Sequence, residues 1–291
     1  MSPRLRITVT AVLWSTGGAA IKWCGFAGWQ LAGFRAGVAC LTLLALIPEA
    51  RRGWTGRTAV VGVGYAATTL LYVQANKLTT AANAIFLQNT SPLFIVALAP
   101  LLLGEHVTRR DVVHMALMGL GLVLFFTAAP TAFATAPNPR LGNGLAVTCA
   151  ATWSLTLVGY RWVARGGGPA GAPVARAVVC GNLIACAVAL IVAYPFEPGR
   201  AADWAAIGYL GVFQLGVAYF FFIRAVPHIR ALEVSLLLLL EPVLSPVWAW
   251  LIHGETPGPM ELVGATLILT TMVLRAWRDA RSPAAAPATG A

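Results

Sequence analysis

Two ionisable side chains stand out because each lies deep inside a long apolar segment. Arg35 falls within the apolar run 28–48, and Glu241 directly follows the run Leu236 to Leu240. An ionised group inside a bilayer is costly unless it is paired or meets water, so such residues mark ion and solute pathways. Glu241 is therefore a candidate proton carrier or a candidate partner for a substrate amine. A direct Arg35 to Glu241 ion pair with a structural role is the alternative that the sequence leaves open.

Polar residues gather around prolines at matching places in the two halves of the chain. Proline lacks the N–H that a helix needs and frees a carbonyl of the preceding turn, which leaves backbone polarity for a ligand. Interrupted helices at corresponding positions favour a transporter site, although a packing kink predicts the same pattern. Aligning Pro92 with Pro242 places Ser91 opposite Glu241. The candidate residues are Gln88, Asn89, Ser91 and Pro92 in the first half, and Glu241, Pro242, Ser245 and Pro246 in the second.

The pair Trp14-Ser15 returns as Trp153-Ser154, and both pairs lie within apolar runs. An indole ring stacks on a ligand while its N–H donates one hydrogen bond, so a symmetric tryptophan pair would border a central cavity. Packing or lipid-facing tryptophan is the alternative. The candidate cavity residues from this group and from the later run 203–223 are Trp14, Ser15, Trp153, Gln214 and Tyr219.

Charged residues also recur at the ends of the apolar runs. Lys22-Trp23 and Arg161-Trp162 are typical of interfacial anchors, which hold helix ends at the membrane surface. Glu105 and Glu255 each follow a glycine at the same distance from the repeated proline. We expect these two carboxylates to cap a helix or to form a gate contact.

Residues for other kinds of chemistry lack the necessary spacing. The five cysteines do not follow a metal-ligand pattern, and the chain has neither a phosphate-binding loop nor a zinc-protease motif. We therefore expect no metal, no cofactor and no enzymatic activity. The alternative is an integral-membrane enzyme acting on a lipid-linked substrate at the cytoplasmic interface, which would use Asp111, His114, His228 or Glu233.

Positioning these side chains requires long apolar elements. Hydrophobic residues make up 58% of the 291 residues and charged residues only 10%. The apolar runs are continuous and long enough to cross a bilayer as helices, without the alternation of barrel strands. The sequence thus predicts an all-α integral membrane protein with ten transmembrane helices, at 7–23, 28–48, 58–76, 79–103, 112–130, 141–160, 173–194, 203–223, 231–252 and 259–276.

The repeated motifs divide the chain into two halves. We expect a first five-helix repeat at 1–130, an outer linker at 131–140, a second five-helix repeat at 141–278 and a disordered cytoplasmic tail at 279–291. Five is an odd number, so the second repeat must enter the membrane in the opposite orientation. Two inverted repeats around a midplane site are the architecture of alternating-access carriers.

The net charge of +10 is distributed asymmetrically and not as a nucleic-acid-binding patch. If the N-terminus is cytoplasmic, most arginines fall in cytoplasmic loops, and the other side carries only Lys22, Lys77, Arg140 and Arg200. By the positive-inside rule, this arrangement places both termini in the cytoplasm. We expect a multi-pass protein of the cell (inner) membrane.

These features together resemble the EamA family of the drug/metabolite transporter superfamily. The resemblance rests on the ten spans, the doubled Trp-Ser, Phe34-Arg35, Leu101 to Glu105, and Leu240-Glu241-Pro242 leading to Gly254-Glu255. It implies a secondary transporter that moves small organic solutes, such as amino acids or related metabolites, commonly outward. The resemblance also implies that transport uses an ion gradient, such as a proton gradient, or proceeds by facilitated diffusion. The expected partners are a small-molecule substrate and the lipid bilayer, and the oligomeric state stays open.

Overall fold

The computed structural model describes residues 1–291 except 96–107, 128–132, 168, 170, 230 and 282–291. The described residues form helices and no strand. In chain order these are α1 (Pro3–Ser15), α2 (Gly17–Trp23), α3 (Gly28–Leu46), η1 (Pro48–Ala50), α4 (Gly56–Leu78), α5 (Ala81–Gln88), α7 (Arg109–Thr127), α8 (Pro139–Ala164), α9 (Ala172–Ala193), α10 (Ala201–Tyr209), η2 (Leu210–Val217), α11 (Ala218–Ala225), η3 (Val226–His228), α12 (Ala231–Leu238), α13 (Leu240–His253) and α14 (Pro259–Arg281).

The predicted all-α membrane fold is confirmed. Six helical segments are long and apolar enough to cross a membrane, and two shorter apolar stretches lie within α7 and α14. The expected first, eighth and ninth spans each consist of consecutive helices, namely α1 with α2, α10 with η2 and α11, and α12 with α13. The expected fourth span includes α5, and residues 96–103 of that expectation lie outside the described residues.

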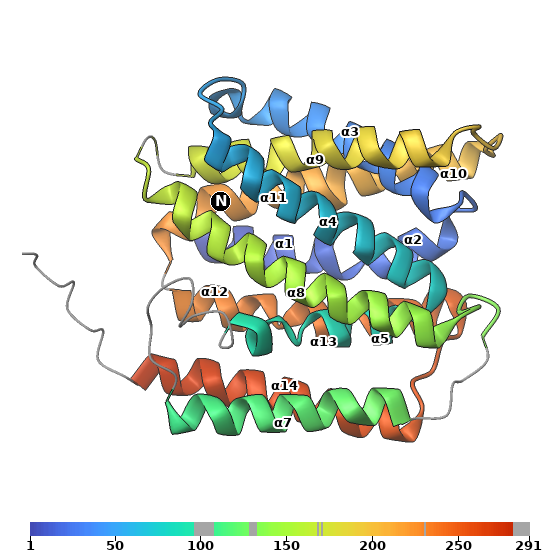
Figure 1. The fold of residues 1–291 in the computed structure, drawn as a ribbon, viewed down its shortest axis with the longest axis vertical. Helices are drawn as coiled ribbons and strands as arrows, with labels where there is room; N and C mark the ends of the chain where they lie inside the picture. The colour runs from blue at the N-terminus through green and yellow to red at the C-terminus, as the bar shows by residue number, and fades with distance from the viewer. Residues whose placement is uncertain (96–107, 128–132, 168, 170, 230, 282–291) are drawn as a thin grey trace, which may run out of the picture.

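Antiparallel packing between α3 and α9 demonstrates the inversion of the two repeats (Figure 1). Near one end of α3, Gly33 lies against Leu190. Further along, the Cys40 thiol donates to the Val179 carbonyl at 3.9 Å. Residue numbers therefore rise in α3 as they fall in α9. Because these helices are the second spans of their halves, equivalent elements run in opposite directions.

Two helices that carry the repeated prolines are interrupted at equivalent positions. A turn at Asn89 ends α5 shortly before Pro92, and a turn at Leu239 separates α12 from α13 shortly before Pro242. Pro246 lies inside α13 without ending it. Both interruptions lie beside the cavity described below, so each one brings backbone polar groups to the same region of the protein.

Close contact between α4 and α8 provides a stability test. A methyl group added at Gly142 would lie 2.6 Å from the Thr79 backbone nitrogen, whereas one added at Gly144 would meet nothing within 4 Å. We expect Gly142→Ala to lower the free energy of unfolding by about 1–3 kcal/mol through overpacking. Gly144→Ala, in the same helix, should change it by less than about 1 kcal/mol. Thermal unfolding of both variants in detergent measures the difference, and equal stabilities would contradict this prediction.

Candidate functional site

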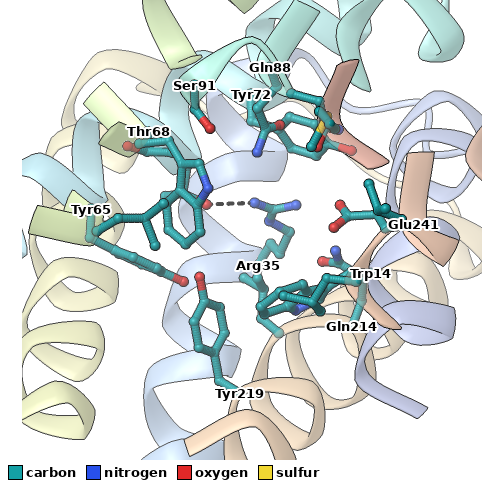
Figure 2. Close-up of a pocket in the computed structure, with 18 residues that line it drawn as sticks. Trp14, Arg35, Tyr65, Thr68, Tyr72, Gln88, Ser91, Gln214, Tyr219 and Glu241 are labelled. Atoms are coloured by element: carbon teal, nitrogen blue, oxygen red, sulfur yellow. Dashed lines mark hydrogen bonds between the residues drawn. The ribbon is translucent and has the colours of Figure 1, made fainter. Parts of the chain in front are cut away.

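A cavity of about 270 Å³ lies between the two repeats. Its wall includes residues from both halves of the chain (Figure 2). Nine residues predicted from the sequence meet there: Trp14, Arg35, Gln88, Asn89, Ser91, Trp153, Gln214, Tyr219 and Glu241. Residues separated by more than half of the chain are thus brought to one cavity of the size of a small metabolite.

Two predicted cavity residues lie elsewhere. Ser15 is fully buried, donates to the Val12 carbonyl at 2.7 Å and accepts from the Trp248 indole at 3.0 Å. Ser245 is 1% exposed and lies close to Gly18. Neither serine lines the cavity, because both face the contact between the first span and α13. Ser15 joins the first span to α13 through the Trp248 hydrogen bond, whereas the Ser245 hydroxyl has no partner among the described residues. The cavity lining includes neither serine, so the prediction that they border it is wrong.

Arg35 enters the cavity wall with most of its hydrogen-bonding capacity unused. The side chain is 2% exposed, and its Nη2 donates to the Thr69 hydroxyl at 2.6 Å. Its Nε and Nη1 atoms have no partner among the described residues. Figure 2 shows the guanidinium group and the Glu241 carboxyl group facing each other across the cavity. The ion pairs of the described residues do not include these two groups, so the direct structural pair is not formed in this conformation.

Aromatic rings form much of the remaining wall. The Trp14 ring centroid lies 5.1 Å from that of Tyr219, and the Tyr219 centroid lies 5.6 Å from that of Tyr65. In the second half of the chain, Trp153 packs edge-on against Tyr160, with 6.2 Å between the ring centroids. Both equivalent tryptophans line the cavity, and they offer flat apolar surfaces for a ligand.

One face of α4 was missed at the sequence level. Tyr65, Thr68, Thr69 and Tyr72 all line the cavity. Their spacing of three, one and three residues places them on a single helix face. This stripe of hydroxyl-bearing residues in an otherwise apolar span was a usable signal, because polar groups within a membrane helix normally face protein or water.

A buried ion pair lies at the end of the bundle that we call the Lys22 end. Lys22 Nζ is 3.0 Å from Glu255 Oε1, and each side chain is 1% exposed. The ammonium group also donates to the carbonyls of Thr79 at 2.7 Å and Thr135 at 2.6 Å. The second carboxylate oxygen accepts from the Ala81 amide at 2.8 Å, at the start of α5. This Lys22–Glu255 network connects the first, fourth and ninth spans.

The network bears on two expectations, namely that Lys22 is an interfacial anchor and that Glu255 caps a helix. Lys22 is not an interfacial anchor, because its buried ammonium group pairs with Glu255, which lies just beyond the end of α13. Trp23 and Trp162, which are 54% and 40% exposed, lie at helix ends as anchors would. Glu255 caps a helix, but that helix is α5 and not its own successor, α14. Glu105 lies outside the described residues.

An exposed pair lies at the opposite end, which we call the Arg224 end. Arg224 Nη2 is 3.0 Å from Glu49 Oε1, and the two side chains are 42% and 37% exposed. A hydrogen bond from its own backbone N–H, with the nearby guanidinium, holds the pKa of Glu49 below its ordinary value. The two ends thus differ, since one is joined by a dry network and the other by a solvated pair.

A comparison with protein-family profiles divides the chain into the same two halves. The profile described as the EamA-like transporter family matches residues 5–127 and 140–276. This chain belongs to the EamA-like transporter family. Each match covers one of the two repeats, so both halves carry the pattern of the family. As an EamA-like protein, the chain has the multi-pass helical membrane fold of a transporter family.

Two relatives support this membership. The aromatic amino acid exporter YddG of Ancylobacter novellus is 32% identical over 154 residues, which are 51% of this chain and 50% of the exporter. The match therefore spans about half of that relative's length. An uncharacterized transporter of Archaeoglobus fulgidus is 27% identical over 215 residues, 73% of each chain. Both names point to a transporter in preference to the membrane enzyme considered above.

A solved structure supports the EamA-like fold alone. The alignment with a solved crystal structure covers 96% of this chain and 99% of the other chain, with a TM-score of 0.64 and 23% sequence identity.

Within the described residues, His, Cys, Asp and Glu side chains do not form a group of three that would hold a metal ion. The cavity wall itself carries one guanidinium group, one carboxyl group, hydroxyl groups, side-chain amides and aromatic rings.

Proposed function

We propose that this protein is a secondary transporter that exports an amino acid or a related metabolite by alternating access. The substrate binds in the cavity between the inverted repeats. The observation that carries this proposal is that the Arg35 guanidinium group, with unsatisfied donors, and the Glu241 carboxyl group face each other in the wall of one cavity without forming an ion pair. Such walls complement a zwitterion, and the rings of Trp14 and Trp153 complement an apolar or aromatic side chain.

Two separate observations support the topology and the direction of transport. The charge asymmetry of the loops favours cytoplasmic termini in the cell (inner) membrane. Export is supported by the relative from Ancylobacter novellus, which is named as an exporter of aromatic amino acids. Glu241 supplies a candidate for proton coupling, because it is a carboxyl group in the cavity wall without an ion-pair partner among the described residues. Protonation in one conformation and release in the other would drive substrate against its gradient.

Transport by the purified full chain in liposomes tests this function. We expect saturable counterflow of phenylalanine or another apolar amino acid from a mixed panel of amino acids and metabolites. We also expect an imposed proton gradient to drive accumulation. Flux that rises linearly with concentration would indicate a channel, and the absence of protein-dependent flux across the panel would overturn the proposal.

A further inference from the structure

Arg35 has more hydrogen-bond donors than the protein satisfies. A guanidinium group carries five N–H donors. Thr69 accepts one of them through Nη2, while Nε and Nη1, which carry three, have no partner in the part of the chain that the structure describes. A buried charged donor without an acceptor is strongly unfavourable. The arrangement is therefore incomplete without a further acceptor.

Helix packing fixes the backbone of Arg35, and one hydrogen bond orients its guanidinium group. Arg35 lies in α3, between the antiparallel partner α9 and the π-helical segment η2. On the η2 side, Gly211 comes so close to the Arg35 carbonyl that an added methyl group would lie 3.0 Å from it. The Thr69 hydroxyl then holds Nη2 on the α4 side. A rigid, oriented guanidinium group favours planar two-oxygen ligands.

The described residues around Arg35 do not supply such a ligand. The cavity wall around Arg35 contains hydroxyl groups, aromatic rings and side-chain amides. Its carboxyl group, Glu241, comes from the ninth span and is not within ion-pair distance of Arg35. The cavity itself lies between the two groups (Figure 2). A small molecule in the cavity can therefore reach the unsatisfied donors.

We infer that Arg35 is the carboxylate-binding residue of this cavity and that Thr69 is a positioning residue that orients it. The inference rests on the proposed transport function and specifies its substrate class, namely solutes that carry a carboxylate. The guanidinium group would bind the two carboxylate oxygens with parallel N–H···O hydrogen bonds. Solutes of the same shape that lack the carboxylate would leave the donors unsatisfied and bind poorly.

The test compares L-phenylalanine with 2-phenylethylamine, which lacks only the carboxylate. Binding is measured by thermal stabilisation of the purified full chain in detergent, because a ligand raises the unfolding temperature according to its affinity. We expect the wild type to bind phenylalanine at least about tenfold more tightly than the amine. Arg35→Met should weaken phenylalanine binding by about 10- to 100-fold and remove this preference.

Two further variants separate recognition from folding. Arg35→Lys keeps a cation but not the planar fork, and we expect it to retain part of the preference. Thr69→Val should reduce the preference severalfold with Arg35 still present. Thr42→Val is the matched control, because Thr42 lies in α3 and donates only to the Val38 carbonyl of its own helix. It should leave the preference unchanged.

The outcomes distinguish this inference from the function on which it rests. A wild type that binds both compounds equally would overturn the carboxylate site and leave transport intact. A folded Arg35→Lys or Thr69→Val protein with the full wild-type preference would overturn the assigned roles. A wild type without saturable transport of any solute in the panel would overturn the proposed function itself, whereas transport confined to solutes that lack a carboxylate would overturn only the carboxylate site.

Discussion

Glu255→Gln is expected to destabilise the folded protein by about 3–5 kcal/mol. The substitution leaves the Lys22 ammonium group buried without its carboxylate, and breaking a buried ion pair from one side has a cost of this size. It also weakens the acceptor for the Ala81 amide at the start of α5. Thermal unfolding in detergent measures the effect. Combining it with Lys22→Met should cost little more than either change alone, because each single substitution already breaks the pair.

The exposed pair at the Arg224 end supplies the matched control. Glu49→Gln removes one charge from a pair whose side chains are 42% and 37% exposed. Solvated pairs contribute about 0–1 kcal/mol, so this change should have a much smaller effect. If Glu255→Gln is no more damaging than Glu49→Gln, the Lys22–Glu255 network does not stabilise this end of the bundle.

Glu241→Gln is expected to abolish accumulation of substrate against its gradient, with a loss of more than about tenfold. Glutamine keeps the size and the polarity of the side chain but cannot carry a proton, so protons and substrate would move independently. Exchange of substrate between the two sides should continue, since it does not require net proton movement. Liposome assays with and without an imposed proton gradient measure both activities.

The same liposomes provide the control for this prediction. Glu49→Gln removes a carboxylate far from the cavity and should leave gradient-driven accumulation intact. A Glu241→Gln protein that still concentrates its substrate when protons flow would refute proton coupling through this residue. Loss of accumulation and exchange together would instead assign Glu241 to substrate binding.

Much of the cavity was predictable because its residues violate a simple rule. Arg35, Glu241 and the polar residues before Pro92 are costly in a bilayer, so their presence in apolar spans indicated a shared interior site. The doubled motifs then placed the equivalent residues of the second half. The same rule applies to Thr68 and Thr69 on the cavity face of α4, but these residues were not predicted as part of the site.

The remaining details depend on helix packing, which local sequence does not encode. Ser15 and Ser245 have the polarity of cavity residues. However, the rotation of their helices places both side chains at the contact between the first span and α13. Lys22 has the position of a surface anchor, and its burial follows from Glu255, a residue that is distant in the sequence. Contacts of this kind are set by the three-dimensional arrangement of the spans.

The antiparallel α3 and α9 pair has a consequence for the origin of the fold. The two helices are counterparts, so their contact is of the kind that two copies of one five-helix chain would make in a symmetric dimer. A half-length ancestor could build this contact only by inserting into the membrane in both orientations. After fusion, each half was free to change on its own, and a carboxylate now stands in one half where the other has Ser91. Neither half alone encloses the cavity, since both contribute to its wall.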